Sequence, residues 1–440
     1  MRIAGMWDKI KSKLDLHTLE VLIKSSKTIL VKIIATTVGI LISIFLGNNL
    51  GSERLGIYDF AIKFGSILII FSMFGFKHVI IKFVSIAKGK SKNQDINSVI
   101  KTSIIFNGLL SILIAVIGIT LLSQLLKIWP SIQELYYPLL IVFIMIIPQT
   151  ISRVYSASLN GYGKIWQANL VDSTLTTILV GLGLLFYWSL KILVTPVNVL
   201  LLYGLCRILV ALIVILLWNK NFKSEARGGF NLRPMIKMAL PMIMITGMEV
   251  VSSNTDIIML GALGTFSDVG IFSVAVKLAL LSSFFLIVVN SAIAPKIALL
   301  FKEFKISEIR LMIQSVSKGL FIIGGLSILL FLFFGKVLLR FWGPEFQDGF
   351  LILLILALGQ LSNLTTGCAG MLLVMCGFEK IHGFISFFAV ILNIILNFIF
   401  IKHHGALGAA VATSLTLVIL NSIKLFMAKS KIGILALPKF

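Results

Sequence analysis

The sequence predicts an all-α integral membrane protein in which twelve transmembrane helices form two pseudo-symmetric six-helix bundles. Composition is the first of three observations behind this prediction: 58% of the 440 residues are hydrophobic, only 13% are charged, and the mean hydropathy is +1.05. Soluble domains are roughly 25% charged, and a core surrounded by water cannot hold so many apolar side chains. A soluble enzyme is therefore excluded.

The second observation is a series of apolar runs, each close to the roughly 20 residues that cross a bilayer as a helix. Before them, residues 1–27 carry apolar side chains at helical spacing among basic ones, which predicts a cytoplasmic amphipathic segment on the membrane surface. The predicted spans are 28–47, 57–76, 102–122, 138–158, 169–189, 197–218, 238–260, 270–293, 314–334, 349–373, 383–401 and 406–427. They define an N-terminal half at 28–218, a cytoplasmic linker at 219–237, a C-terminal half at 238–427 and a cytoplasmic tail at 428–440.

The third observation is an internal repeat that relates the two halves. Leu46-Gly47 and Gly56-Ile57-Tyr58 recur, with one constant spacing, as Leu260-Gly261 and Gly270-Ile271-Phe272, and Gly161-Tyr162-Gly163-Lys164 recurs as Gly377-Phe378-Glu379-Lys380. Because each half holds an even number of spans, both enter the membrane from the same side. The repeats are therefore expected to be parallel about an axis along the membrane normal, as in transporters that rock two bundles around a central site.

The chain is basic, with 39 Lys and Arg against 17 Asp and Glu. These basic residues are scattered between the apolar runs rather than gathered on one face, so nucleic-acid binding is not expected. Most fall in segments that are cytoplasmic when the N-terminus is inside, which predicts two cytoplasmic termini. The longest predicted outer loop, residues 123–137, is too short for a catalytic domain. The cysteines Cys206, Cys368 and Cys376 show neither a disulfide nor a metal-ligand spacing.

Basic side chains inside spans are candidates for substrate binding, because a charge there costs roughly 2.5 to 3.5 kcal/mol unless it faces a partner or a water-filled cavity. Arg207 lies about 15 Å from either surface by helical rise, and its planar fork suits a phosphate or pyrophosphate. An ion pair with Glu249 is the alternative. Lys63 and Lys277 hold equivalent repeat positions and are predicted to line the cleft between the halves. Lys32, near the cytoplasmic end of the first span, is a further candidate.

Simpler roles for these lysines remain open. Asp59 precedes Lys63 by one helical turn, which favours an ion pair within the helix. A lysine stem can also extend its charged end to the lipid headgroups, which suits Lys32 in particular.

Acidic side chains inside spans are candidates for coupling transport to protons or sodium, since a carboxylate in a low dielectric can take up and release a proton. These residues are Glu249, Asp256, Asp59 and Asp172. Glu249 is the preferred coupling residue, and a static counter-ion to Arg207 or Lys277 is its alternative role.

Amide side chains on the repeat-related spans 138–158 and 349–373 are candidates for binding sugar hydroxyls. They are Gln149, Gln360 and Asn363. Hydrogen bonding between helices is the alternative role for such groups. Pro148 is expected to kink the span that contains it.

Two stretches carry a resemblance to a known family. LGNNLGSERLGIYDFAIKFGSILIIFSMFGFKHVIIKFVS, residues 46–85, resembles the region of helices 1 and 2 in polysaccharide-transporter flippases. TDIIMLGALGTFSDVGIFSVAVKLA, residues 255–279, resembles the region of helices 7 and 8. The family belongs to the multidrug/oligosaccharidyl-lipid/polysaccharide exporter superfamily.

The resemblance implies a flippase, not an enzyme. Its expected cargo is an undecaprenyl-pyrophosphate-linked oligosaccharide, the O-antigen unit of lipopolysaccharide or a similar repeat unit. It would move this cargo from the cytoplasmic to the outer leaflet of a bacterial inner membrane by alternating access. No cofactor is expected, and coupling to protons or sodium is possible. The expected partners are the lipid-linked oligosaccharide, membrane lipids, and polysaccharide polymerase and chain-length proteins.

Two other functions remain as alternatives. A multidrug antiporter of the same superfamily would bind cations, for which a buried Arg207 is unfavourable. A membrane polysaccharide polymerase or ligase would need an outer catalytic loop longer than any that the sequence offers.

Overall fold

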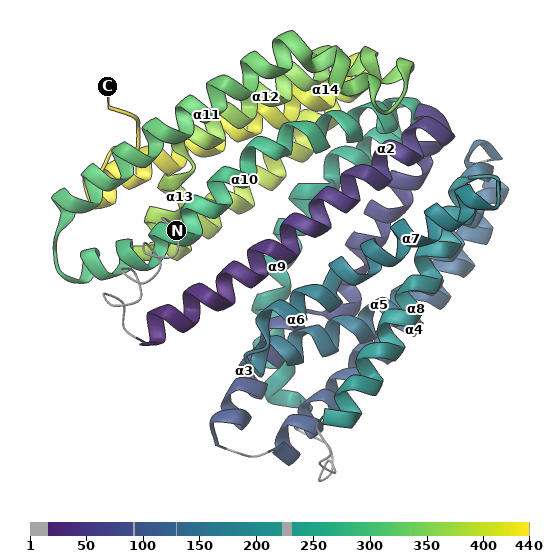
Figure 1. Ribbon diagram of the computed structural model, residues 1–440, viewed down its shortest axis with the longest axis horizontal. Coiled ribbons are helices and arrows are strands. Elements are labelled where there is room, and N and C mark those ends of the chain that lie inside the picture. Colours follow the sequence, from purple (N-terminus) through teal and green to yellow (C-terminus); the bar gives the residue numbers. More distant parts are fainter. Residues whose placement is uncertain (1–15, 91–92, 129, 222–230, 440) are drawn as a thin grey trace, which may run out of the picture. The chain divides into compact units, whose positions relative to one another are not determined.

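The computed structural model describes residues 16–90, 93–128, 130–221 and 231–439, and every regular element in these ranges is helical (Figure 1). The first set comprises α2 (Leu16–Met73), α3 (Phe76–Gly89), α4 (Asn93–Ile128), η1 (Pro130–Leu135), α5 (Tyr136–Gly161), α6 (Ile165–Asn169), η2 (Leu170–Thr174), α7 (Leu175–Ser189) and α8 (Pro196–Asn221). The second set comprises α9 (Leu232–Leu263), α10 (Phe266–Lys302), α11 (Ile306–Arg340), η3 (Pro344–Gly349), α12 (Phe350–Thr366), α13 (Cys368–Met375) and α14 (Glu379–Ile432). The predicted all-helical fold class is confirmed.

The predicted N-terminal segment and linker are described only in part. Residues 1–15 lie outside the described ranges, and residues 16–27 form the beginning of α2, continuous with the first predicted span. Of the linker 219–237, residues 222–230 lie outside the described ranges.

Ten helical segments in the described ranges are long and apolar enough to cross a membrane. Two helices are much longer than one crossing needs, since α2 has 58 residues and α14 has 54. Each leaves helical geometry at one glycine, Gly51 with φ 75° and Gly405 with φ 50°. A positive φ is readily accessible only to glycine. Both glycines lie between two predicted spans, so kinks stand where the sequence predicts loops, and the count of twelve spans stays a prediction.

Two further predicted spans are interrupted. The span 169–189 is made of the end of α6, a π-helical turn at η2 and α7, and the span 349–373 is divided into α12 and α13 at Gly367. Helical irregularities of this kind free backbone groups for other contacts.

The chain packs into two compact units. The first unit comprises the described residues that fall within 16–42, 68–193 and 197–244, and the second comprises 43–67, 194–196 and 245–439. The sequence analysis places 43–67 in the N-terminal half, whereas these residues pack with the second unit. The physical reason is a close helix crossing of α2 and α10, described below with the site.

In the first unit, α5 packs against α3, α4 and α6. Phe76 of α3 is fully buried and stacks on Phe106 of α4, with ring centroids 4.9 Å apart. Ser72 Oγ lies 2.8 Å from Thr150 Oγ1, which links the end of α2 to α5. Polar contacts between helices therefore occur beside the apolar packing.

In the second unit, α12 packs against α10, α11 and α14. Its apolar core contains Ile297, Ile313 and Leu364, none of which is exposed. Gly359 allows α12 and α14 to approach closely, because a Cβ there would lie 2.8 Å from Ser414 Oγ. Small residues at helix contacts are typical of membrane proteins. The three cysteines are buried free thiols, as the sequence predicts.

Candidate functional site

In the second unit, α2 and α10 cross in backbone contact at two repeat-equivalent glycines. A Cβ on Gly56 would lie 1.8 Å from the carbonyl oxygen of Phe266, and a Cβ on Gly270 would lie 2.0 Å from that of Ser52. Neither position has room for a side chain. Equivalent residues of the two repeat copies therefore meet at this crossing.

An ion pair lies next to the crossing. Lys277 Nζ donates a hydrogen bond to Asp59 Oδ2 at 2.8 Å, and Ser273 Oγ donates to the same oxygen. Lys277 Nζ also lies 3.1 Å from Ser43 Oγ, which accepts a hydrogen bond from Trp342 Nε1 at 2.9 Å. Asp59 is buried, with 6% of its surface exposed. The network joins one copy of the repeat, through Ser43 and Asp59, to the other.

Lys63, the repeat equivalent of Lys277, is half-buried on α2 and forms no ion pair with the described residues. The close ion pair of Asp59 is with Lys277, which α10 brings to that carboxylate, rather than with Lys63. Lys32 is exposed on α2, in the first unit.

A second carboxylate of the same unit, Asp256 on α9, lies among polar side chains of α14. Its Oδ1 accepts a hydrogen bond from Asn397 Nδ2 at 2.7 Å, and its Oδ2 accepts one from Thr413 Oγ1 at 2.8 Å. The amide oxygens of Asn393 and Asn397 are buried without a hydrogen-bond partner. One carboxylate, two unpartnered amide oxygens and a hydroxyl are the donor types that hard cations prefer.

A row of polar side chains crosses the second unit from α10 through α12 to α14. Ser283 Oγ donates to Gln360 Oε1, Asn363 Nδ2 donates to the same oxygen at 3.2 Å, and Asn421 Nδ2 lies 3.4 Å from Asn363 Oδ1. The two amides predicted for sugar binding, Gln360 and Asn363, are therefore brought together and also connect helices, which is the alternative role considered from the sequence.

In the first unit, Arg207 of α8 is held by its own neighbours. Its Nε and Nη2 donate to Tyr203 Oη at 3.1 and 2.8 Å, and its Nη1 donates to the carbonyl oxygen of Asp172 at 2.8 Å. The Asp172 carboxylate lies 3.7 Å from Arg153 Nε of α5. Arg207 is 3% exposed. The cluster holds two guanidinium groups and one carboxylate, and only Arg153 lies against that carboxylate, so the cluster carries an excess positive charge.

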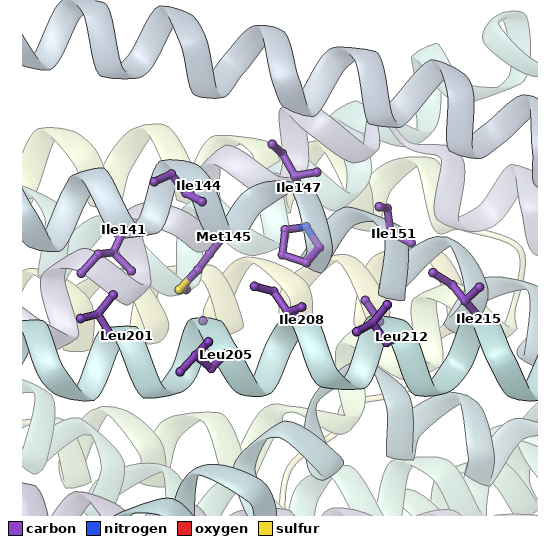
Figure 2. A pocket seen from close by; sticks show the side chains of 13 residues that line it. Ile141, Ile144, Met145, Ile147, Ile151, Leu201, Leu205, Ile208, Leu212 and Ile215 are labelled. Carbon is purple, nitrogen blue, oxygen red and sulfur yellow. The ribbon is translucent and has the colours of Figure 1, made fainter.

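The first unit also contains an apolar cavity of about 420 Å³ between α5 and α8 (Figure 2). Its walls are aliphatic side chains such as Ile144, Met145, Leu205 and Ile208. Pro148 of α5 also lines it. A cavity with this lining suits a hydrocarbon chain and does not bind a sugar headgroup.

The other two predicted site residues lie apart from these clusters. Gln149 is buried on α5, and Glu249 is exposed on α9 in the second unit. Asp256, unlike Glu249, is therefore enclosed by hydrogen-bonding side chains of α14.

Sequence reasoning missed several members of these clusters. Arg153 lies inside a predicted span, and this position alone marks it as a candidate. Asn393 and Asn397 stand one turn apart in an apolar run, which is a recognisable signal. Ser273 and Tyr203 carry no such signal, because their importance comes from helix packing.

Comparison with known proteins identifies the family. The family model described as "Polysaccharide biosynthesis protein" matches residues 21–301, more than half of the chain. The chain belongs to the polysaccharide biosynthesis protein family. This result confirms the family expected from residues 46–85 and 255–279.

One relative of this polysaccharide biosynthesis protein is the capsular polysaccharide biosynthesis protein CapF of Staphylococcus aureus, 30% identical over 149 residues. The alignment covers 33% of this chain and 37% of CapF, well under two thirds of either.

Solved structures share the fold across almost the whole chain. An inward-facing multidrug resistance MATE family transporter of the MOP superfamily has a TM-score of 0.74 at 13% identity, covering 92% of this chain and 94% of that one. The lipid II flippase MurJ, in an inward closed conformation, has a TM-score of 0.73 at 16% identity, covering 93% and 87%. The chain is therefore a multi-pass membrane protein with the fold of these transporters.

Proposed function

We propose that this protein is a flippase that carries an undecaprenyl-pyrophosphate-linked oligosaccharide, the O-antigen unit or a similar polysaccharide repeat unit, from the cytoplasmic to the outer leaflet. The observation that carries the proposal is the cluster of Arg153, Arg207 and Asp172, whose excess positive charge lies inside membrane-spanning segments. An intramembrane cation calls for an anionic partner. Family membership, and the fold shared with a lipid II flippase, support a lipid-linked polysaccharide precursor as that partner.

The two chemical parts of such a cargo need different surroundings. Guanidinium groups bind pyrophosphate oxygens in paired hydrogen bonds, and the amides Gln149, Gln360 and Asn363 are proposed to bind sugar hydroxyls. Lys63 and Lys32 are proposed to add positive charge for the anionic cargo, and Lys277 is proposed to do so when its ion pair with Asp59 opens. The isoprenoid tail would stay in hydrocarbon, for which the cavity between α5 and α8 offers an apolar wall.

Alternating access is proposed to act through the crossing of α2 and α10. The Asp59–Lys277 ion pair and the contact of Gly56 with Gly270 join the two repeat copies. Any movement that separates α2 from α10 must break this contact, so the ion pair would stabilise the state in which the two helices meet.

Coupling is proposed to occur at Asp256, with sodium as the cation. The amide oxygens of Asn393 and Asn397 have no hydrogen-bond partner. They favour sodium over a proton, because a proton on the Asp256 carboxylate would donate only one hydrogen bond, to one oxygen at most. The other candidate coupling residues are Glu249, Asp59 and Asp172. If one of them is the coupling residue, we expect the coupling ion to be a proton.

The proposed setting is a bacterial inner membrane, with both termini cytoplasmic. Membrane lipids surround the protein, and polysaccharide polymerase and chain-length proteins would receive its product. The reaction that follows must polymerise or transfer the flipped unit on the outer face.

The test is transport of a fluorescent undecaprenyl-pyrophosphate-linked oligosaccharide by the purified protein in proteoliposomes. We expect the label to become accessible on the opposite leaflet faster than in empty liposomes. In cells that lack the protein, lipid-linked units should accumulate on the cytoplasmic face. No transport, with normal polymer in those cells, would refute the proposal.

The competing candidate is a multidrug cation antiporter, which the fold shared with a MATE family transporter favours. Cells that lack the protein would then keep normal polymer and show altered drug sensitivity. The same deletion strain thus separates the two functions.

A further inference from the structure

Lys424 lies in the membrane-spanning helix α14, about 12 Å before its end by helical rise. It is half-buried, and residues around it on α14, including Ile423 and Met427, pack against the apolar core of the second unit. A lysine in this position must find an anion or reach the headgroups with its stem.

Gly370 of α13 brings the lysine together with a histidine. A Cβ on Gly370 would lie 3.2 Å from His382 Nε2 and 3.4 Å from Lys424 Cδ. The His382 imidazole comes from the first turn of α14. It and the Lys424 stem therefore both pack on the backbone of α13 at Gly370, where no side chain intervenes.

Neither Lys424 nor His382 has a side-chain hydrogen bond or ion pair with the described part of the chain. The nearby Glu379 and Lys380 are exposed. An ammonium with no counter-charge among the described residues, next to an imidazole that can donate a hydrogen bond, suits an external anion.

The pair also continues the polar row of the same unit. Asn421, one turn before Lys424 on α14, lies 3.4 Å from Asn363 Oδ1, and Asn363 donates to Gln360. A row of amides that ends at an ammonium and an imidazole matches a sugar phosphate, since amides bind hydroxyls and an ammonium binds phosphate as a point charge.

We propose that Lys424 and His382 form an anion subsite that binds a phosphate of the lipid-linked sugar, with Asn421 and Asn363 toward the sugar. This inference rests on the proposed flippase function. A phospholipid headgroup has the same phosphate chemistry, so the experiment must separate these two sources.

The experiment measures binding of radiolabelled undecaprenyl pyrophosphate to the full-length protein in phosphatidylcholine nanodiscs. We expect Lys424→Met to weaken binding about 10- to 100-fold, as for loss of a hydrogen bond to a charged group. Lys424→Arg should bind within a few-fold of the parent protein and show that the fold is intact. His382→Gln should give a smaller loss.

Lys429→Met is the matched control, because Lys429 is an exposed lysine of the same helix. It should leave affinity unchanged within about twofold. An equal loss in Lys429→Met, or normal binding by Lys424→Met, would overturn the subsite. Gly370→Ala should weaken binding moderately, since its methyl group meets both basic side chains.

The same measurement in nanodiscs that contain phosphatidylglycerol identifies the source of the phosphate. If unlabelled inorganic pyrophosphate competes and phosphatidylglycerol does not, the subsite binds substrate. Displacement by phosphatidylglycerol would overturn that assignment in favour of a lipid headgroup. The transport assay separates this inference from the flippase function. If the parent protein and Lys424→Met transport equally well, only the subsite is refuted. If the parent protein does not transport, the flippase function is refuted.

Discussion

Asp59 and Lys277 form an ion pair of 2.8 Å although they belong to different copies of the internal repeat. Ser273, which binds the same carboxylate oxygen, is itself the repeat equivalent of Asp59. The pair is thus asymmetric within a symmetric crossing: one copy supplies the carboxylate and the other supplies the ammonium. Lys63 remains beside it without an ion pair among the described residues.

The first prediction concerns this ion pair. Asp59→Asn should lower transport strongly, because it leaves the Lys277 ammonium without its counter-charge next to the helix crossing. Exchanging the charges in Asp59→Lys with Lys277→Asp should restore part of the loss. The double-mutant cycle measures the coupling. Glu53→Gln, an exposed acid of the same helix, should behave as the parent protein. Additive effects of the two single changes would show that the pair is not functional.

The second prediction concerns the glycines of the crossing. Gly56→Ala should destabilise the protein by about 1–3 kcal/mol or more, since its methyl group would meet a backbone carbonyl that cannot move aside. Gly39→Ala, in open space on the same helix, should be neutral or stabilising by up to about 1 kcal/mol through helix propensity. Thermal unfolding in detergent compares them, and equal melting temperatures would contradict the close crossing.

The third prediction concerns the cation at Asp256. Sodium chloride should raise the melting temperature above that in choline chloride, and about 2.7 kcal/mol of stabilisation is expected at 100 times the dissociation constant. Asp256→Asn should abolish this difference, and Asn397→Ala should weaken it. Glu249→Gln should keep it. If Glu249→Gln, and not Asp256→Asn, abolishes the sodium effect, the coupling site is at Glu249.

The fourth prediction concerns Arg207. Arg207→Lys should reduce both stability and pyrophosphate binding, because a lysine cannot hold Tyr203 Oη and the Asp172 carbonyl with a planar fork. Tyr203→Phe removes one acceptor and should cost about 0.5–1.5 kcal/mol. Lys220→Met, an exposed change on the same helix, is the control. Lowered stability with unchanged pyrophosphate binding would make Arg207 a structural residue only.

The sequence by itself determined the class of protein, its helices and its family. Hydropathy and span length depend on local composition, so the apolar runs were found without any knowledge of packing. The repeat was visible because its glycines are required by close backbone contact, as Gly56 and Gly270 show. Even the kinks at Gly51 and Gly405 lie where the sequence predicted turns.

Only the tertiary structure decided which charges meet. Asp59 pairs with Lys277 rather than Lys63, and Asp256 lies among the amides of α14 while Glu249 is exposed. Helices that are apolar on nearly every side do not reveal which face turns inward. The partners of a buried charge are set by helix rotation and crossing, and these depend on side-chain packing between segments far apart in the chain.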